Sequence, residues 1–194
     1  YDAACRQFSW AEAQRELAGL PGGRGVNIAY EAVDRHVETG NGARTALKWI
    51  AKDRSTKTIT YGELSSLTNR FANALQSLGI KRGERVFSLL GRVPELFITA
   101  LGTWKSGAVF CPLFSAFGPE PIKARMAIAG VTVLVTTERL FQRKINPILN
   151  ELHVDLCRVA NLPLACTEPA IHGALARRQK QHAVRITVND AWYR

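Results

Sequence analysis

The amino-acid sequence predicts an α/β fold in which a parallel sheet is flanked by helices. Short apolar segments rich in β-branched residues alternate with amphipathic segments of helical period, and glycine or proline lies at many of the boundaries. Hydrophobic residues make up 46% of the 194 positions and charged residues 22%, which is typical of a globular protein with a packed core. Strands that alternate with helices of about 10–15 residues indicate βαβ units and parallel strand pairing.

The first third of the chain predicts helices and a hairpin. The apolar spacing favours a short helix over residues 9–18 and a second helix from 27 to 37. Two β-branched segments, at 46–50 and 57–61, flank a charged turn and therefore predict a β-hairpin.

The alternating region follows this hairpin. Its amphipathic segments predict helices over residues 64–78, 94–104 and 119–129. Its apolar segments predict strands over residues 85–90, 108–113 and 131–136. We expect parallel strands around Val86, Val109 and Val133, covered by the intervening helices.

The chain divides into three expected parts: a helical extension (1–26), an α/β unit (27–155) and a basic, atypical tail (156–194). Residues 1–155 carry 20 Lys and Arg against 14 Asp and Glu, a net charge of +6, whereas the tail carries 6 against 2, or +4. We expect the alternation of strands and helices to stop near residue 155. The tail is either a poorly folded segment, for which a frameshift is one cause, or a genuine basic extension.

Composition argues against several classes of function. The total charge of +10 is spread over the chain, and aromatic residues are not interleaved with Lys and Arg as in RNA-binding signatures, which argues against a nucleic-acid partner. The four cysteines and four histidines show no metal-ligand spacing. The first residues are polar and no apolar run approaches about 20 residues, so we expect neither a signal peptide nor a membrane span, and a cytoplasmic location with reduced thiols.

A series of short blocks carries a family resemblance. In order they read NIAYEAVDRH (27–36), ITYGEL (59–64), NRFANAL (69–75), LGIKRGERV (78–86), PEL (94–96), KSGAV (105–109) and PLFSAF (112–117). From about residue 8 to residue 140 the chain resembles the N-terminal subdomain of acetyl-CoA synthetases, AMP-forming acetate–CoA ligases of the acyl-adenylate-forming superfamily. The resemblance implies conversion of acetate, ATP and CoA into acetyl-CoA, AMP and pyrophosphate, with Mg²⁺ bound alongside ATP.

The phosphate-binding and catalytic motifs of that family have no match in this sequence. The family's phosphate loop, rich in Ser, Thr and Gly and ending in Lys-Gly, has no equivalent, and the catalytic lysine of the family's C-terminal domain is also missing. The one glycine cluster, at residues 22–25, lacks hydroxyls and a following lysine and is interpreted as a turn. We therefore assign no catalytic residue and no metal ligand, and expect the chain alone to be inactive. The alternative is a non-catalytic nucleotide- or CoA-binding module, or a degenerate remnant of the family.

The resemblance leaves one candidate site, for CoA. Phe114 matches a family aromatic that packs against the CoA adenine, and Ser115 and Ala116 stand where many members have two glycines, so their side chains are expected to crowd the approach. Basic residues beyond the next strand hold the CoA 3′-phosphate in the family. Here Arg139, Arg143 and Lys144 lie in that region, although their spacing departs from Arg-x-x-Arg. A solvated basic turn is the competing interpretation.

Two further expectations concern contacts. Glu31 and Asp34 lie three residues apart on one predicted helix, and we expect them to pair with Arg35 or Arg24 rather than to act as an acid–base couple. The resemblance also implies that a second subdomain packs on this one. We therefore expect an exposed apolar face that promotes self-association, besides a small-molecule partner, a nucleotide or CoA, that is bound only weakly.

Overall fold

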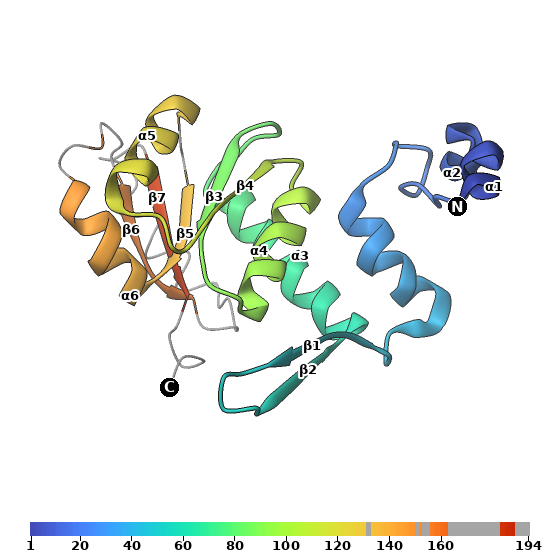
Figure 1. The fold of residues 1–194 in the computed structure, drawn as a ribbon, viewed down its shortest axis with the longest axis horizontal. Coiled ribbons are helices and arrows are strands. Elements are labelled where there is room, and N and C mark those ends of the chain that lie inside the picture. Colours follow the sequence, from blue (N-terminus) through green and yellow to red (C-terminus); the bar gives the residue numbers. More distant parts are fainter. Residues whose placement is uncertain (131–132, 150–151, 153–155, 163–182, 189–194) are drawn as a thin grey trace.

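The computed structural model describes residues 1–130, 133–149, 152, 156–162 and 183–188, and it confirms the α/β prediction. A five-stranded parallel sheet has the order β4-β3-β5-β7-β6 (Figure 1). Its strands are β3 (Arg85–Leu89), β4 (Val109–Leu113), β5 (Val133–Thr137), β6 (Leu156–Leu162) and β7 (Ala183–Val188). Val86, Val109 and Val133 thus all lie in parallel strands, as predicted.

The two faces of β3 face two separate cores. Val86 packs into one hydrophobic cluster, whereas Phe87 and Leu89 pack into the other. This alternation follows from the two-residue period of a strand, whose successive side chains point to opposite faces. Parallel sheets are covered on both faces, which explains why every residue of β5 is buried.

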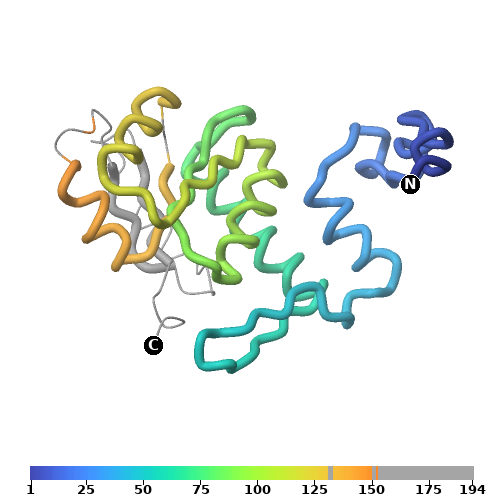
Figure 2. Tube along the Cα trace, viewed as in Figure 1, coloured from blue at the N-terminus to red at the C-terminus, as the bar shows by residue number. Residues whose placement is uncertain are grey.

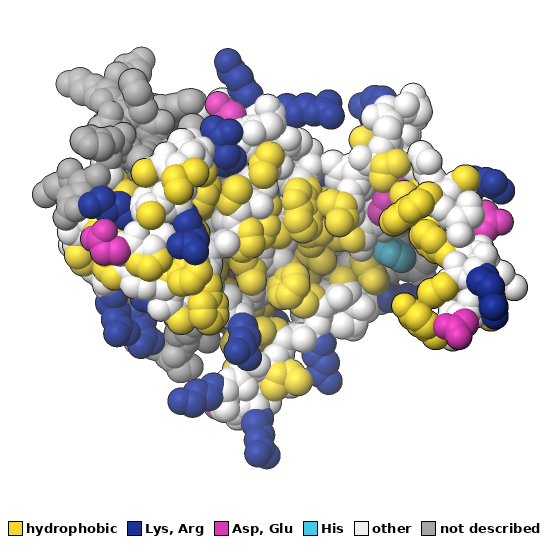
Figure 3. All heavy atoms as spheres, turned by 45° about the horizontal axis from the view of Figure 1, so that its top comes forward, with side chains coloured by type: hydrophobic (Ala, Val, Ile, Leu, Met, Phe, Trp, Pro, Cys, Tyr) yellow, Lys and Arg dark blue, Asp and Glu magenta, His cyan; other side chains and the backbone are white. Residues whose placement is uncertain are grey.

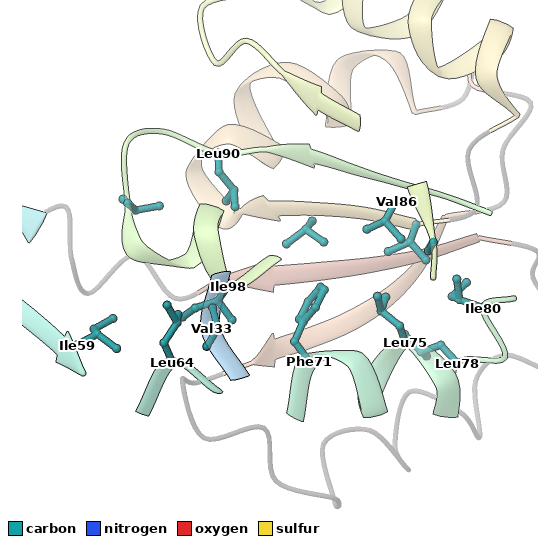
Figure 4. Close-up of a cluster of buried hydrophobic side chains, with 14 residues drawn as sticks. Val33, Ile59, Leu64, Phe71, Leu75, Leu78, Ile80, Val86, Leu90 and Ile98 are labelled. Atoms are coloured by element: carbon teal, nitrogen blue, oxygen red, sulfur yellow. The ribbon is translucent and has the colours of Figure 1, made fainter. Parts of the chain in front are cut away.

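The first core lies between the sheet and helices α3 (Tyr61–Ser77) and α4 (Pro94–Lys105). Leu64, Phe71 and Leu75 on α3 recur at helical spacing and point toward the sheet (Figure 4). A capping box fixes the start of α3, because the Thr60 hydroxyl accepts a hydrogen bond from the Glu63 N–H while the Glu63 carboxylate accepts one from the Thr60 N–H.

The second core lies on the other face of the sheet. It is covered by α5 (Pro119–Ala129), by the short helix α6 (Glu138–Leu140), and by the π-helical turn η3 (Phe141–Ile145) and 3₁₀ turn η4 (Asn146–Ile148) that continue it. Ile122 and Met126 of α5 and Ile145 of η3 are fully buried there. α5 ends at Gly130, which adopts the left-handed conformation that favours glycine (φ 55°).

The predicted hairpin is confirmed as β1 (Thr45–Ile50) paired antiparallel with β2 (Thr56–Thr60). It is joined to the loop that follows β3, because the indole N–H of Trp49 donates to the carbonyl of Arg92 at 2.7 Å. The hairpin is thereby tied to the end of the sheet at which the parallel strands have their carboxyl termini.

The N-terminal residues form helices outside the sheet layers (Figure 2). The predicted helix over 9–18 is confirmed in shorter form as α2 (Trp10–Arg15), preceded by α1 (Asp2–Gln7), which the sequence analysis missed. The helix predicted over 27–37 is confirmed and contains the π-helical turn η1 (Tyr30–Asp34), but it continues beyond its predicted end through η2 (Val37–Asn41), where the break comes at Gly40 with a φ of 84°.

The expectation that strands stop near residue 155 is wrong. β6 and β7 both lie beyond that point and extend the sheet from β5. Their sequences, LCRVANL and AVRITV, are apolar and partly β-branched, but the polar, basic composition of the surrounding tail obscured them. The division into 1–26, 27–155 and 156–194 stays a prediction, and residues 163–182 and 189–194 of the tail lie outside the described part.

Candidate functional site

The candidate loop lies at the carboxyl end of β4. The connection that leaves β3 runs through α4 on one face of the sheet, whereas those that leave β4 and β5 run through α5 and α6 on the other face. Open α/β sheets bind their ligands beyond the carboxyl ends of the strands, where the connections diverge in this way. The segment at 114–118 therefore borders the position in this sheet at which a ligand is expected.

Residues 114–117 form a hydrogen-bonded turn. The Phe117 N–H donates to the Phe114 carbonyl at 3.0 Å. The two phenyl rings meet edge to face, with centroids 5.7 Å apart and planes at 89°. Phe114 is 64% exposed, so an apolar ring is presented to solvent on an ordered turn. Such a ring can stack on a planar base.

Ser115 and Ala116 require no special backbone conformation. Among the described residues Arg54 is the one non-glycine position with a positive φ, so neither Ser115 nor Ala116 adopts a conformation that favours glycine. Ser115 is half-buried and Ala116 is exposed. The turn is therefore compatible with side chains at both positions, while their expected crowding of a bound CoA stays a prediction.

Of the three basic candidates, Lys144 is brought directly to this turn. Its ammonium, which extends from η3, donates to the carbonyl oxygens of Ser115 and Phe117, the latter at 2.6 Å. Arg143 precedes it on η3 with an exposed side chain, and Arg139 on α6 is also exposed. The structure thus places Lys144 on loop carbonyls, a contact that the interpretation as a phosphate ligand did not foresee.

Sequence reasoning included Phe117 in the candidate loop without giving it a role, and it missed Arg125. The Arg125 guanidinium of α5 lies over the Phe117 ring, 4.4 Å from its centroid. A cation at this distance is attracted by the ring's negative face. Arg125 follows Phe117 by eight residues across the start of a helix, a spacing with no sequence signature. Lys144 and Arg125 therefore contact the same turn through different groups, the one through backbone carbonyls and the other through the Phe117 ring.

A buried carboxyl lies near the same end of the sheet. Glu95, in the first turn of α4, is only 6% exposed, and neither of its carboxylate oxygens has a hydrogen-bond partner among the described residues. Burial raises the pKa of this carboxyl above its ordinary value, and the Lys57 ammonium on β2 partly opposes that shift. Burial also lowers the pKa of Lys57. The two shifts have opposite signs because burial disfavours the charged form of either group.

The two acidic residues of η1 have different partners. Glu31 pairs with Arg35 at 3.0 Å, as predicted, and also accepts hydrogen bonds from the Ala18 and Gly19 N–H groups. The prediction for Asp34 is wrong, because its carboxylate binds the Lys105 ammonium at 2.6 Å. The positions lie 71 residues apart, which is why no helical spacing revealed this pair.

The described part of the chain offers no group of three or more His, Cys, Asp or Glu side chains that could hold a metal ion. Within the same residues, no helix combines the length and the apolar character that a bilayer crossing requires.

Comparison with known proteins defines the class to which this fold and loop belong. The family model of AMP-binding enzymes matches residues 33–191, and the chain belongs to that family. An acetyl-coenzyme A synthetase of Bacillus subtilis (strain 168) is 38% identical over 144 residues, which cover 74% of this chain and 25% of that protein. A 3-hydroxypropionyl-coenzyme A synthetase of Sulfurisphaera tokodaii is 34% identical over 139 residues, covering 69% of this chain and 21% of that protein.

A solved structure supports the same family assignment. The crystal structure of the Brucella canis acyl-CoA synthetase superposes with a TM-score of 0.68 at 37% sequence identity, covering 79% of this chain and 27% of that one. The chain matches the N-terminal part of the acyl-CoA synthetase fold. It thus spans 25% of the Bacillus relative and 27% of the Brucella structure.

Proposed function

We propose that this chain supplies the CoA-contacting loop of an AMP-forming acetate–CoA ligase. The whole reaction converts acetate, ATP and CoA into acetyl-CoA, AMP and pyrophosphate. The observation that supports a CoA role is the ordered turn at 114–117, with its exposed Phe114 ring at the carboxyl end of a parallel sheet. ATP and Mg²⁺ would be bound by segments that this sequence does not contain.

Each candidate residue has a distinct part in this proposal. Phe114 stacks on the adenine of CoA, and the backbone at Ser115 and Ala116 lies beneath it. Arg139 and Arg143 attract the 3′-phosphate. Stacking contributes ~1–3 kcal/mol per base, and an exposed ion pair less than ~1 kcal/mol. Their sum corresponds to a dissociation constant on the order of millimolar for the chain alone.

Titration of CoA and ATP, followed by NMR chemical shifts at low and high salt, tests this proposal. We expect CoA to bind weakly, more weakly at high salt, and more weakly still after Phe114→Ala. We expect ATP to bind no better than CoA. Much tighter binding of ATP, or CoA-induced shifts that cluster away from Phe114 and Arg143, would contradict the assignment.

We expect no acetate-dependent adenylation by the purified chain. The physical reason is that no residue of this sequence matches the family's phosphate loop or catalytic lysine, which position and neutralise the triphosphate. Incubation with ATP, Mg²⁺ and acetate should release pyrophosphate no faster than a buffer control. Turnover that disappears on mutation within this chain would refute the expectation.

The alternative function is a non-catalytic module that binds CoA or a nucleotide, or a degenerate remnant of the family. The DNA downstream of the reading frame separates the two proposals, because a phosphate loop encoded there would support the ligase. In either case we propose a cytoplasmic location and a small-molecule partner rather than a nucleic acid.

We also propose self-association through an apolar surface. Hydrophobic side chains gather across one face of the molecule (Figure 3), and Phe97 of α4 and Val109 of β4 are each nearly half exposed. The Val109 N–H donates toward β3, to the Glu84 carbonyl. Successive residues of a strand point their N–H groups to opposite sides. At Pro112 the N–H would point away from β3, and proline has none, so the outer edge of β4 lacks a donor there. Association through side chains is therefore favoured over the addition of a strand.

Sedimentation velocity over a range of concentrations measures this property. We expect oligomers at high concentration, together with binding of a dye specific for apolar surface, because a patch beyond a few hundred Å² is unusual on a monomer. Phe97→Ser should shift the distribution toward monomer. A sharp monomer at every concentration, with no dye binding, would exclude such a surface.

A further inference from the structure

Lys144 makes the contacts of a residue that organises a loop. Its ammonium has three N–H donors, and it uses two of them on the carbonyl oxygens of Ser115 and Phe117, which lie on either side of Ala116. The contacts join η3, which follows β5, to the turn that follows β4, across 29 and 27 residues of sequence. Two carbonyls that converge on one cation make a fixed backbone arrangement, because each bond constrains a different peptide plane.

These bonds place the Lys144 ammonium against backbone carbonyl oxygens. Its side chain is half-buried, and backbone carbonyl oxygens carry partial negative charge that partly neutralises the ammonium. The neighbouring Arg143, by contrast, is exposed to solvent. The ammonium of Lys144 is therefore less available to an anionic ligand than the exposed guanidinium of Arg143.

The constraint extends to the Phe114 ring. Lys144 holds the Phe117 carbonyl, the Phe117 N–H closes the turn on the Phe114 carbonyl, and the Phe117 ring packs edge to face on Phe114. Arg125 covers the Phe117 ring and so limits its movement. The orientation of Phe114 is thus coupled to Lys144 through contacts within the turn.

We infer that Lys144 is a positioning residue, which sets the turn at 114–117 and the direction of the Phe114 ring, rather than a ligand of the CoA phosphate. In its effect on CoA this inference rests on the proposed function. It predicts that Lys144 acts on the recognition of the base and is indifferent to the 3′-phosphate. Arg143 is predicted to act in the opposite way.

The first experiment uses the chain without ligand. Lys144→Met removes the donors and keeps much of the apolar stem, and Lys52→Met, on the exposed turn of the hairpin, is the matched control for loss of one charge. Lys144→Met should speed hydrogen exchange of the Phe117 amide by about tenfold or more relative to wild type. It should also shift the ring resonances of Phe114 and Phe117. Lys144→Arg, which retains several donors, should restore part of both signals, and Lys52→Met should change neither.

The second experiment compares CoA with dephospho-CoA, which lacks the 3′-phosphate. Lys144→Met should weaken both ligands by the same factor, about threefold to tenfold. Arg143→Gln should weaken CoA and leave dephospho-CoA unchanged. A Lys144→Met effect confined to CoA would make Lys144 a phosphate ligand and overturn the inference.

The hydrogen exchange and ring shifts of the chain without ligand test this inference separately from the proposed function. Unchanged exchange and ring shifts in a folded Lys144→Met variant would overturn the positioning role, whatever CoA does. If wild type binds neither CoA nor dephospho-CoA, the proposed function fails, while accelerated exchange at Phe117 still supports the positioning role. Methyl shifts of Ile122 and Met126 report whether the adjacent core is intact, and Lys144→Gln, a milder change, replaces Lys144→Met if that variant does not fold.

Discussion

Asp34→Ala is expected to lower the free energy of unfolding by about 3–5 kcal/mol, because it leaves a buried ammonium without its counter-ion. The Lys105 side chain is only 9% exposed, and its ammonium binds the Asp34 carboxylate at 2.6 Å and the Asn69 side-chain oxygen at 2.7 Å. Burial lowers the pKa of Lys105, and the contact with Asp34 opposes that shift. Chemical denaturation at pH 7 measures the change.

Removal of the other partner, by Lys105→Met, should lower the free energy of unfolding by less than Asp34→Ala does. Lys105→Met leaves Asp34, which is 22% exposed and still accepts a hydrogen bond from the Ser65 hydroxyl at 2.6 Å. Part of the lost attraction is therefore replaced by water and Ser65. Lys48→Met, at an exposed position of β1, is the control and should change stability by less than about 0.5 kcal/mol. Equal costs for Asp34→Ala and Lys48→Met would show that the buried pair contributes nothing.

The ion pair between Asp34 and Lys105 could not be predicted from the sequence. It joins η1 to the end of α4 across 71 residues, and no local period relates the two positions. Lys144 and the turn at 114–117 are the same kind of case, because the contact depends on how β4 and β5 are placed in the sheet. Family resemblance made Lys144 a candidate contact for CoA, but only the folded chain shows that its donors are used by carbonyls.

Local patterns, in contrast, were sufficient for most of the fold. The period of Leu64, Phe71 and Leu75 predicted α3, and the capping box at Thr60 marks its first turn. Alternation of strands and helices was sufficient to predict parallel pairing, because a strand–helix–strand connection is right-handed and returns to the same sheet. The strands β6 and β7 were not predicted, although they are at least as long as β3–β5, because the polar and basic residues of the surrounding tail masked a modest apolar signal.

Gly102→Ala is expected to destabilise the chain by about 1–3 kcal/mol through overpacking, although alanine is the better helix former. Gly102 lies on α4 where that helix crosses α3, and a methyl group there would stand 2.7 Å from the Phe71 ring and 2.9 Å from the Thr68 carbonyl oxygen. In an open helical position the same change would stabilise by up to about 1 kcal/mol. Here the sign reverses, because one obstacle is backbone and the helices must separate.

A control and a double-mutant cycle identify the cause. Gly118→Ala introduces a methyl group with nothing within 4 Å and at a negative φ, so its effect should stay below about 1 kcal/mol. Phe71→Leu removes the ring that Gly102→Ala meets, and the cost of Gly102→Ala should shrink in that background without vanishing, because the Thr68 carbonyl remains. Thermal unfolding of the four variants measures this coupling. A stabilising Gly102→Ala, or a cost unaffected by Phe71→Leu, would mean that α3 and α4 do not pack as closely as 2.7 Å implies.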